Sequence, residues 1–137
     1  MRKAILLMIL AVVSSNAAAE WVEVSATDKK TFYANPATIR KKGNIVKMWE
    51  LVDVKPSGFT KSMQVFSESK EEFSMSTREQ EEFYCKKEQT RTLYISTHSG
   101  NMGEGELISR SSNPGKWEPI VPNSIDESLW KFACGKR

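Results

Sequence analysis

Two cysteines, Cys85 and Cys134, constrain the fold of this 137-residue chain more than any other feature of its sequence. In an exported protein, an even number of cysteines predicts disulfide bonding, and two cysteines allow one intramolecular pairing. The bond would close a loop of about 50 residues, which in the chain-entropy model stabilises the folded state by about 4 kcal/mol. A zinc site or a reactive thiol is the alternative, but the chain offers only one histidine, His98, and no CxxC spacing.

The N-terminal residues predict that the chain is exported. Arg2 and Lys3 precede an apolar run at residues 5–13, and three alanines at 17–19 supply the small side chains that signal peptidase accepts. A transmembrane anchor is the alternative, but a helix that crosses a bilayer needs about 20 apolar residues. No cysteine lies at the expected cleavage point after the run, so we expect no lipidation there. We expect residues 1–19 to be a cleavable signal peptide, and residues 20–137 to be one domain in the periplasm or outside the cell.

The net charge argues against nucleic acid as a partner. The whole chain carries a formal charge of +3, and removal of Arg2 and Lys3 with the signal peptide leaves +1. A nearly neutral domain has no overall field that would collect a polyanion. No second apolar run is long enough to cross a membrane, so we expect the mature domain to have no transmembrane segment.

Short β-like runs separated by turn residues dominate the first two thirds of the predicted domain. The longest, residues 45–54, is apolar on both faces and is expected to be a central strand. Other strands are expected at 21–24, 31–34, 61–66, 79–86, 92–98 and 106–109. Turns are expected at Asn35-Pro36, which would end its strand, and at 41–44, 55–58, 100–105 and 112–115. Residues 29–30 and 67–78 are predicted to be mobile loops.

The C-terminal residues predict a helix. Ser124 and Glu127 have the spacing of a capping box, in which each side chain bonds the backbone amide of the other residue, and Gly135 suits the end of a helix. One helical face carries Ile125, Leu129 and Phe132. Such a helix cannot bury its apolar face alone. The predicted fold class is therefore α+β: an antiparallel β-sheet with one C-terminal α-helix packed on it and tied to it by the disulfide bond.

No catalytic or metal-binding pattern emerges from the sequence. His98 is the sole imidazole, and beside a predicted turn it is interpreted as a surface or hydrogen-bonded residue. The glycine-rich segment 100–105 lacks the Lys-Ser/Thr of a phosphate-binding loop and is interpreted as a hairpin turn. We therefore expect no enzyme, no metal and no cofactor. A hydrolase that uses carboxylates is a further alternative, because 17 acidic residues offer many pairs.

Six glutamates form an acidic stretch between residues 68 and 82. They are Glu68, Glu71, Glu72, Glu79, Glu81 and Glu82. Runs of like charge usually belong to solvated surfaces, so we interpret this stretch as a solvated loop and strand edge.

Seven residues are the candidate contacts to a partner. One basic cluster comprises Arg40, Lys41 and Lys42, close to Lys47 in the sequence; the other comprises Lys86, Lys87 and Arg91, at a predicted turn between strands. Either cluster could bind an acidic polymer or a protein, and the alternative is that both are merely solvated. Trp117 lies in an irregular segment and either pins it against the helix or is an exposed interface anchor.

Several motifs occur together in a fixed order. They are WVEV at 21–24, YANPATIR at 33–40, EFYC at 82–85, SGNMGEGE at 99–106, PGKWEP at 114–119 and PNSIDESLWKFAC at 122–134. In these motifs the chain resembles the surface-adhesin protein E-like family of Gram-negative bacteria. The resemblance implies an antiparallel sheet with an attached C-terminal helix and one disulfide bond.

The resemblance also implies a function. It points to an exported, non-enzymatic module that binds protein partners, because the family takes its name from an adhesin that engages host extracellular-matrix proteins such as vitronectin and laminin. The alternative is a periplasmic envelope protein with a housekeeping or stress role and no contact with a host. We expect the partner to be a matrix protein in the first case and a periplasmic protein in the second.

Overall fold

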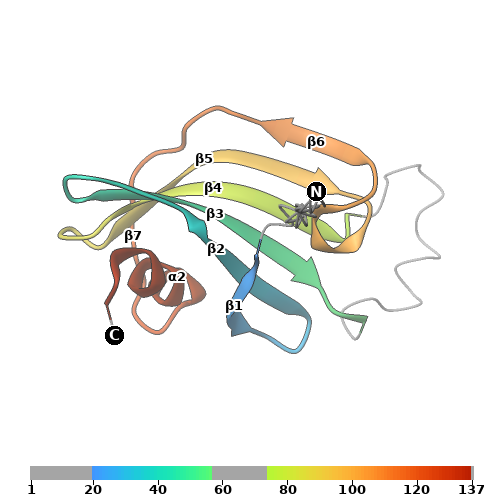
Figure 1. Ribbon diagram of the computed structural model, residues 1–137, viewed down its shortest axis with the longest axis horizontal. Coiled ribbons are helices and arrows are strands. Elements are labelled where there is room, and N and C mark those ends of the chain that lie inside the picture. Colours follow the sequence, from blue (N-terminus) through green and yellow to red (C-terminus); the bar gives the residue numbers. More distant parts are fainter. Residues whose placement is uncertain (1–19, 57–73, 137) are drawn as a thin grey trace, which may run out of the picture.

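The computed structural model describes residues 20–56 and 74–136, and in them the predicted α+β fold is confirmed (Figure 1). Six antiparallel strands form one sheet in the order β1-β2-β3-β4-β5-β6. Their bounds are β1 Val22–Ala26, β2 Lys30–Lys42, β3 Ile45–Val54, β4 Ser76–Tyr84, β5 Gln89–His98 and β6 Leu107–Ser111. A short strand, β7 (Glu118–Pro119), pairs with β5, and the helix α2 (Ile125–Cys134) packs on one face of the sheet.

The central position predicted for residues 45–54 is confirmed. These residues form β3, which pairs with β2 on one side and with β4 on the other. Alternate side chains of a strand point to opposite faces. Val46 and Met48 are fully buried on the face that α2 covers, whereas Leu51 is fully buried on the other face. A strand with apolar residues on both faces therefore lies in the middle of the sheet.

The prediction that Asn35-Pro36 ends a strand is wrong. β2 continues through this dipeptide to Lys42, but its register with β3 shifts between Asn35 and Arg40. Side chains replace the missing ladder bonds in this bulge: the Thr38 hydroxyl accepts from the amide of Trp49 at 3.0 Å, and the Asn35 side-chain oxygen accepts from the amide of Ala37 at 3.1 Å. Proline is tolerated in a strand at such irregular positions, because it has no amide hydrogen to pair.

Three segments expected to be turns or loops contribute to strands. Lys41 and Lys42 are the last residues of β2, so the turn that follows is reduced to Gly43-Asn44, with Gly43 at φ +61°. Lys30 begins β2 and residues 76–78 begin β4. Three expected features lie outside the described residues. They are the part of the 67–78 loop up to residue 73, the strand at 61–66 and the signal peptide at 1–19. The segment 100–105 was expected to be a turn, and it does connect two paired strands, β5 and β6. It contains a short 3-10 turn, η2 (Asn101–Gly103).

The hydrophobic core lies between the sheet and α2. Its buried members are Ala34, Val46, Met48, Phe83, Ile120, Leu129, Trp130 and Ala133. Trp130 also donates from its indole nitrogen to the carbonyl of Tyr84 at 3.3 Å, which fixes the helix to the end of β4. At the same place the predicted disulfide bond is confirmed: it joins Cys85, the residue after β4, to Cys134, the last residue of α2, with 5.7 Å between their Cα atoms.

The helix begins where the capping pattern predicts. The Ser124 hydroxyl accepts a hydrogen bond from the amide of Glu127 at 3.2 Å, and Gly135 ends the helix in the left-handed conformation at φ +65°. The carboxylate of Glu127, expected to reach back to Ser124, instead lies 3.1 Å from the ammonium nitrogen of Lys131.

We expect the substitution Ser124→Ala to lower the free energy of unfolding by about 1 kcal/mol, because it removes the acceptor for the first turn of α2. Urea denaturation followed by circular dichroism measures the change. Ser128→Ala, within the same helix, is the control and should have little effect. An unchanged midpoint for Ser124→Ala would mean that this cap contributes no stability.

Candidate functional site

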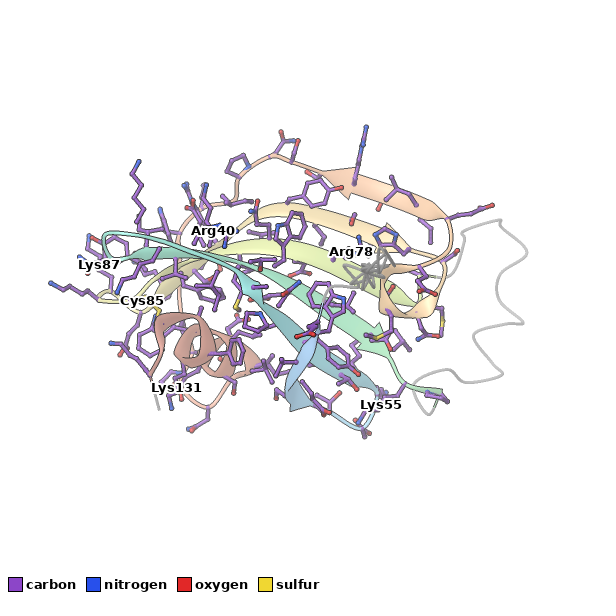
Figure 2. All side chains as sticks on the ribbon, in the orientation of Figure 1. Arg40, Lys55, Arg78, Cys85, Lys87 and Lys131 are labelled. Atoms are coloured by element: carbon purple, nitrogen blue, oxygen red, sulfur yellow. A yellow bond between two sulfur atoms is a disulfide. The ribbon has the colours of Figure 1, made fainter. Side chains whose placement is uncertain are left out.

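The two basic clusters, which are distant in the sequence, converge at one end of the sheet. The turn between β2 and β3 lies beside the turn between β4 and β5, because the amide of Cys85 donates to the carbonyl of Asn44 at 2.9 Å. The exposed lysines of these turns and strand ends are Lys41, Lys42, Lys86 and Lys87. Lys87 and Cys85 mark this end of the molecule in Figure 2, away from Lys55 and Arg78. The fold thus gathers four positive charges that the sequence keeps in two groups.

Aromatic rings join the basic residues at this end. The Lys87 ammonium lies 5.0 Å from the centre of the Tyr84 ring, and the Tyr84 and Trp117 rings meet edge to face with 5.9 Å between their centres. The Arg91 guanidinium lies 4.8 Å from the centre of the Trp117 ring. Cations this close to aromatic faces are held by the ring quadrupole. These contacts hold the segment of Trp117 against β4 and β5.

We call this surface the basic–aromatic end. It comprises Lys41, Lys42, Tyr84, Lys86, Lys87, Arg91 and Trp117. Arg91 is also held by an ion pair with the buried Glu82 at 2.8 Å, and Lys47 approaches the same carboxylate at 3.7 Å. Arg40, the remaining candidate contact, donates to carbonyls of its own bulge, those of Ala37 and Ile39, at 3.0 Å each. The structure therefore leaves the lysines, rather than the arginines, as the most available charges.

A second concentration of polar groups lies on the face of the sheet that α2 covers. Glu50 on β3 stands directly opposite Glu79 on β4, and Glu81 follows two residues later on the same side of β4. Oxygen atoms of the three carboxyl groups all lie within 4.8 Å of one another. Glu81 and Glu82 are buried, and β4 is an inner strand. The interpretation of residues 79–82 as a solvated loop and strand edge is therefore wrong, while 68, 71 and 72 lie outside the described residues.

The surroundings of these carboxyl groups perturb their protonation. Burial raises the pKa of Glu50 well above its ordinary value, and the nearby carboxylates of Glu81, Glu79 and Asp126 raise it further. Burial likewise raises the pKa of Glu79 to about 7, with additional contributions from Glu81 and Asp126 that the positive charge of Lys30 partly offsets. Removing a carboxylate from water and placing it beside another carboxylate both disfavour the charged form.

A pocket of about 360 Å³ reaches two members of this cluster, Glu50 and Glu79, beside α2. Its lining residues are Lys30, Phe32, Glu50, Val52, Thr77, Glu79, Ile125, Asp126 and Leu129. The pocket thus lies between β2, β3, β4 and α2, and its lining combines apolar side chains with carboxyl groups.

His98 belongs to neither site. It ends β5 on the opposite face of the sheet from the three glutamates, and its Nε2 lies 2.9 Å from the Ser96 hydroxyl. Burial, followed by the charge of Arg78, lowers its pKa. This agrees with the interpretation of His98 as a hydrogen-bonded residue.

Comparison with known proteins decides the family. The sequence model described as "Surface-adhesin protein E" matches residues 21–135. The chain belongs to the surface-adhesin protein E family. The match begins just after the predicted signal peptide and ends beside Cys134, so it spans every described strand and the helix. A search of curated proteins found no significant match.

Solved structures of protein E from Haemophilus influenzae share the fold. Crystal form II of that protein aligns with a TM-score of 0.60 at 13% identity, covering 84% of this chain and 87% of that chain. Protein E from non-typeable Haemophilus influenzae aligns with a TM-score of 0.54 at 11% identity, covering 88% of this chain and 79% of that one. At these identities the likeness establishes the architecture alone.

Family membership supports an adhesin-like, exported surface protein; it points to a non-enzymatic adhesin and suggests protein partners. None of the described helices is long and apolar enough to cross a membrane.

The two basic clusters and Trp117 were identified from the sequence, but their convergence was not predicted, and the carboxylate cluster was missed. Two signals in the sequence could have revealed it. Glu50 is the one charged residue on the face of β3 that carries Val46 and Met48, which suggests a carboxyl group inside the core. Glu79 and Glu81 are spaced by two residues, so on a strand they share a face.

Proposed function

We propose that this chain is an exported, non-enzymatic protein-binding module of the adhesin type, and that its basic–aromatic end contacts an acidic segment of the partner. Its membership of the surface-adhesin protein E family supports the class of function. The convergence of two distant basic clusters on one aromatic-containing surface is the observation that carries the choice of contact site.

The chemistry of this surface suits an interface with an acidic partner. None of the ion pairs found among the described residues involves Lys41, Lys42 or Lys86, so their charges are available to a partner. Tyrosine, tryptophan and arginine are enriched among residues that dominate binding energy, and here Tyr84 and Trp117 are already ordered by mutual packing. Pre-ordered rings lose little conformational entropy when a partner binds.

The partner class follows from where the protein acts. If it is displayed to a host, the partner is an extracellular-matrix protein; if it is retained in the periplasm, the partner is an envelope protein. Protease treatment of intact cells, with a periplasmic protein as marker, separates these two locations. Digestion while the marker survives places the chain on the surface, and survival until the outer membrane is opened directs the search to periplasmic partners.

We expect the double charge reversal Lys42→Glu with Lys87→Glu to weaken binding to immobilised vitronectin or laminin by about tenfold or more, mainly through slower association. Surface plasmon resonance at two salt concentrations measures the effect. A matched variant, Lys29→Glu with Arg110→Glu, reverses two exposed charges outside this surface and should bind almost as the wild type does. Equal losses in both variants would show that overall charge, rather than the basic–aromatic end, governs binding.

A further inference from the structure

The carboxylates of Glu50, Glu79 and Glu81 are held in a fixed arrangement, unlike solvated acidic side chains on a protein surface. Two neighbouring strands of a twisted sheet hold them, and their side chains point to one side. Glu81 is oriented by two hydroxyl groups, since Thr90 donates to its Oε2 at 2.5 Å and Thr92 donates to its Oε1 at 2.7 Å. A carboxylate oxygen that accepts one hydrogen bond retains lone-pair capacity for a further contact. Glu81 is therefore fixed in place and still able to bind a ligand.

Glu50 provides an independent indication of a ligand. Its side chain lines the pocket, the residue is only 4% exposed, and its Oε1 has no hydrogen-bond partner. Leaving a buried polar atom without a partner costs about 1–3 kcal/mol, and more when the group is charged. A bound species that contacts Oε1 would remove this cost. The same species would relieve the repulsion among the three carboxylates.

We propose that Glu50, Glu79 and Glu81 bind a hard divalent cation, and that Ca²⁺ is the ion that fits best. All donors are oxygens, and no histidine or cysteine joins the described cluster, which favours Ca²⁺ or Mg²⁺ over softer metals. Ca²⁺–oxygen bonds of about 2.3–2.6 Å place two ligands of one ion no more than about 5 Å apart. The 4.8 Å limit on the three oxygens meets this condition.

The pocket, which Glu50 and Glu79 line, supplies a route and space for the hydrated ion. Asp126, in the first turn of α2, lines it and adds a further negative charge, while Thr77 adds a hydroxyl group. Lys30 is the one basic residue of the lining, and none of the ion pairs found in the described ranges joins it to the three glutamates. With only three protein ligands, the ion would keep several waters. A dissociation constant of about 10⁻⁴–10⁻³ M, as in extracellular calcium modules, is therefore expected.

Calorimetric titration of the purified, EDTA-treated protein with CaCl₂ tests the proposal. We expect one Ca²⁺ per chain, and a rise of several degrees in the midpoint of thermal unfolding at about 10 mM CaCl₂. The double variant Glu50→Gln with Glu79→Gln keeps the shape of both side chains and should bind Ca²⁺ at least about tenfold more weakly. Circular dichroism and the absence of free thiols establish that this variant is folded.

Two controls make the outcome decisive. The variant Glu104→Gln with Glu106→Gln removes two exposed carboxylates and should bind Ca²⁺ like the wild type. NaCl at matched ionic strength should not reproduce the thermal shift. The proposal is overturned if the wild type binds no Ca²⁺, if the Glu50/Glu79 variant keeps full affinity, or if NaCl gives the same shift, because the last result would mean screening of the carboxylates.

Discussion

Replacing both cysteines, Cys85→Ser with Cys134→Ser, is expected to lower the free energy of unfolding by about 4 kcal/mol. The two residues are 49 positions apart, and a cross-link across such a loop removes much of the conformational entropy of the unfolded chain. The bond also has a local role, because it ties the end of β4 to the end of α2, where Trp130 packs and bonds to Tyr84. Without the disulfide bond, the helix is held by core packing and by the hydrogen bond from Trp130 to Tyr84.

Guanidinium denaturation of the wild type and the double serine variant, with and without dithiothreitol, measures this loss. Dithiothreitol should lower the stability of the wild type to that of the variant and leave the variant unchanged. Far-ultraviolet circular dichroism of the variant at low denaturant should show whether the sheet persists when the helix is released. Equal stability of oxidised wild type and variant would contradict the assigned role of the bond, even if the bond itself is present.

Features set by local chemistry were predicted from the sequence. The strand at 45–54 follows from its apolar pattern, and the helix from the Ser124 cap and from Gly135, whose preferences act within one turn of chain. The pairing of Cys85 with Cys134 follows from there being no other partner. In each case the residues that specify the structure are adjacent, or are the only candidates.

Features that depend on distant contacts were not predicted. β2 passes through Asn35-Pro36 because Thr38 bonds to Trp49 on the neighbouring strand, 11 residues away, and no local pattern reveals that bond. Both basic clusters were identified by composition, but their meeting depends on the bond between Cys85 and Asn44. Sheet register determines both results, and register is set by the whole set of paired strands.

The carboxylate cluster was also not predicted from the sequence, and in this case the reason is its charge. Glutamate is almost never buried unless it is paired, so a stretch rich in glutamate is normally assigned to the surface. The pairing of β4 between β3 and β5 places Glu79 and Glu81 on a covered face beside Glu50. The cost of burying them is consistent with a role other than stability, since functional sites are where such perturbed groups collect.

Raising the pH from 5 to 8 in the presence of EDTA is expected to destabilise the folded chain through this cluster. The pKa of Glu79 rises from 4.5 to about 7 on folding, and that of Glu50 also rises. Between pH 4.5 and about pH 7, the folded chain holds protons that the unfolded chain has released, so the free energy of unfolding falls as the pH increases. For Glu79 the full shift corresponds to about 3 kcal/mol, which is present below pH 4.5 and lost above pH 7. Glu81, Asp126 and Lys30 also face these groups and modulate the loss.

Comparison of variants isolates this contribution from the other titrating groups. Glu79→Gln cannot ionise at that position, so its urea midpoint should fall much less between pH 5 and pH 8 than that of the wild type, and at pH 8 the variant should be the more stable protein. Glu104→Gln, on the exposed turn after η2, should keep the wild-type pH dependence. A wild-type slope in Glu79→Gln would mean that Glu79 titrates normally in the folded state. A reduced slope would show that the fold holds this carboxyl at an energetic cost, which is the condition under which a bound cation would stabilise it.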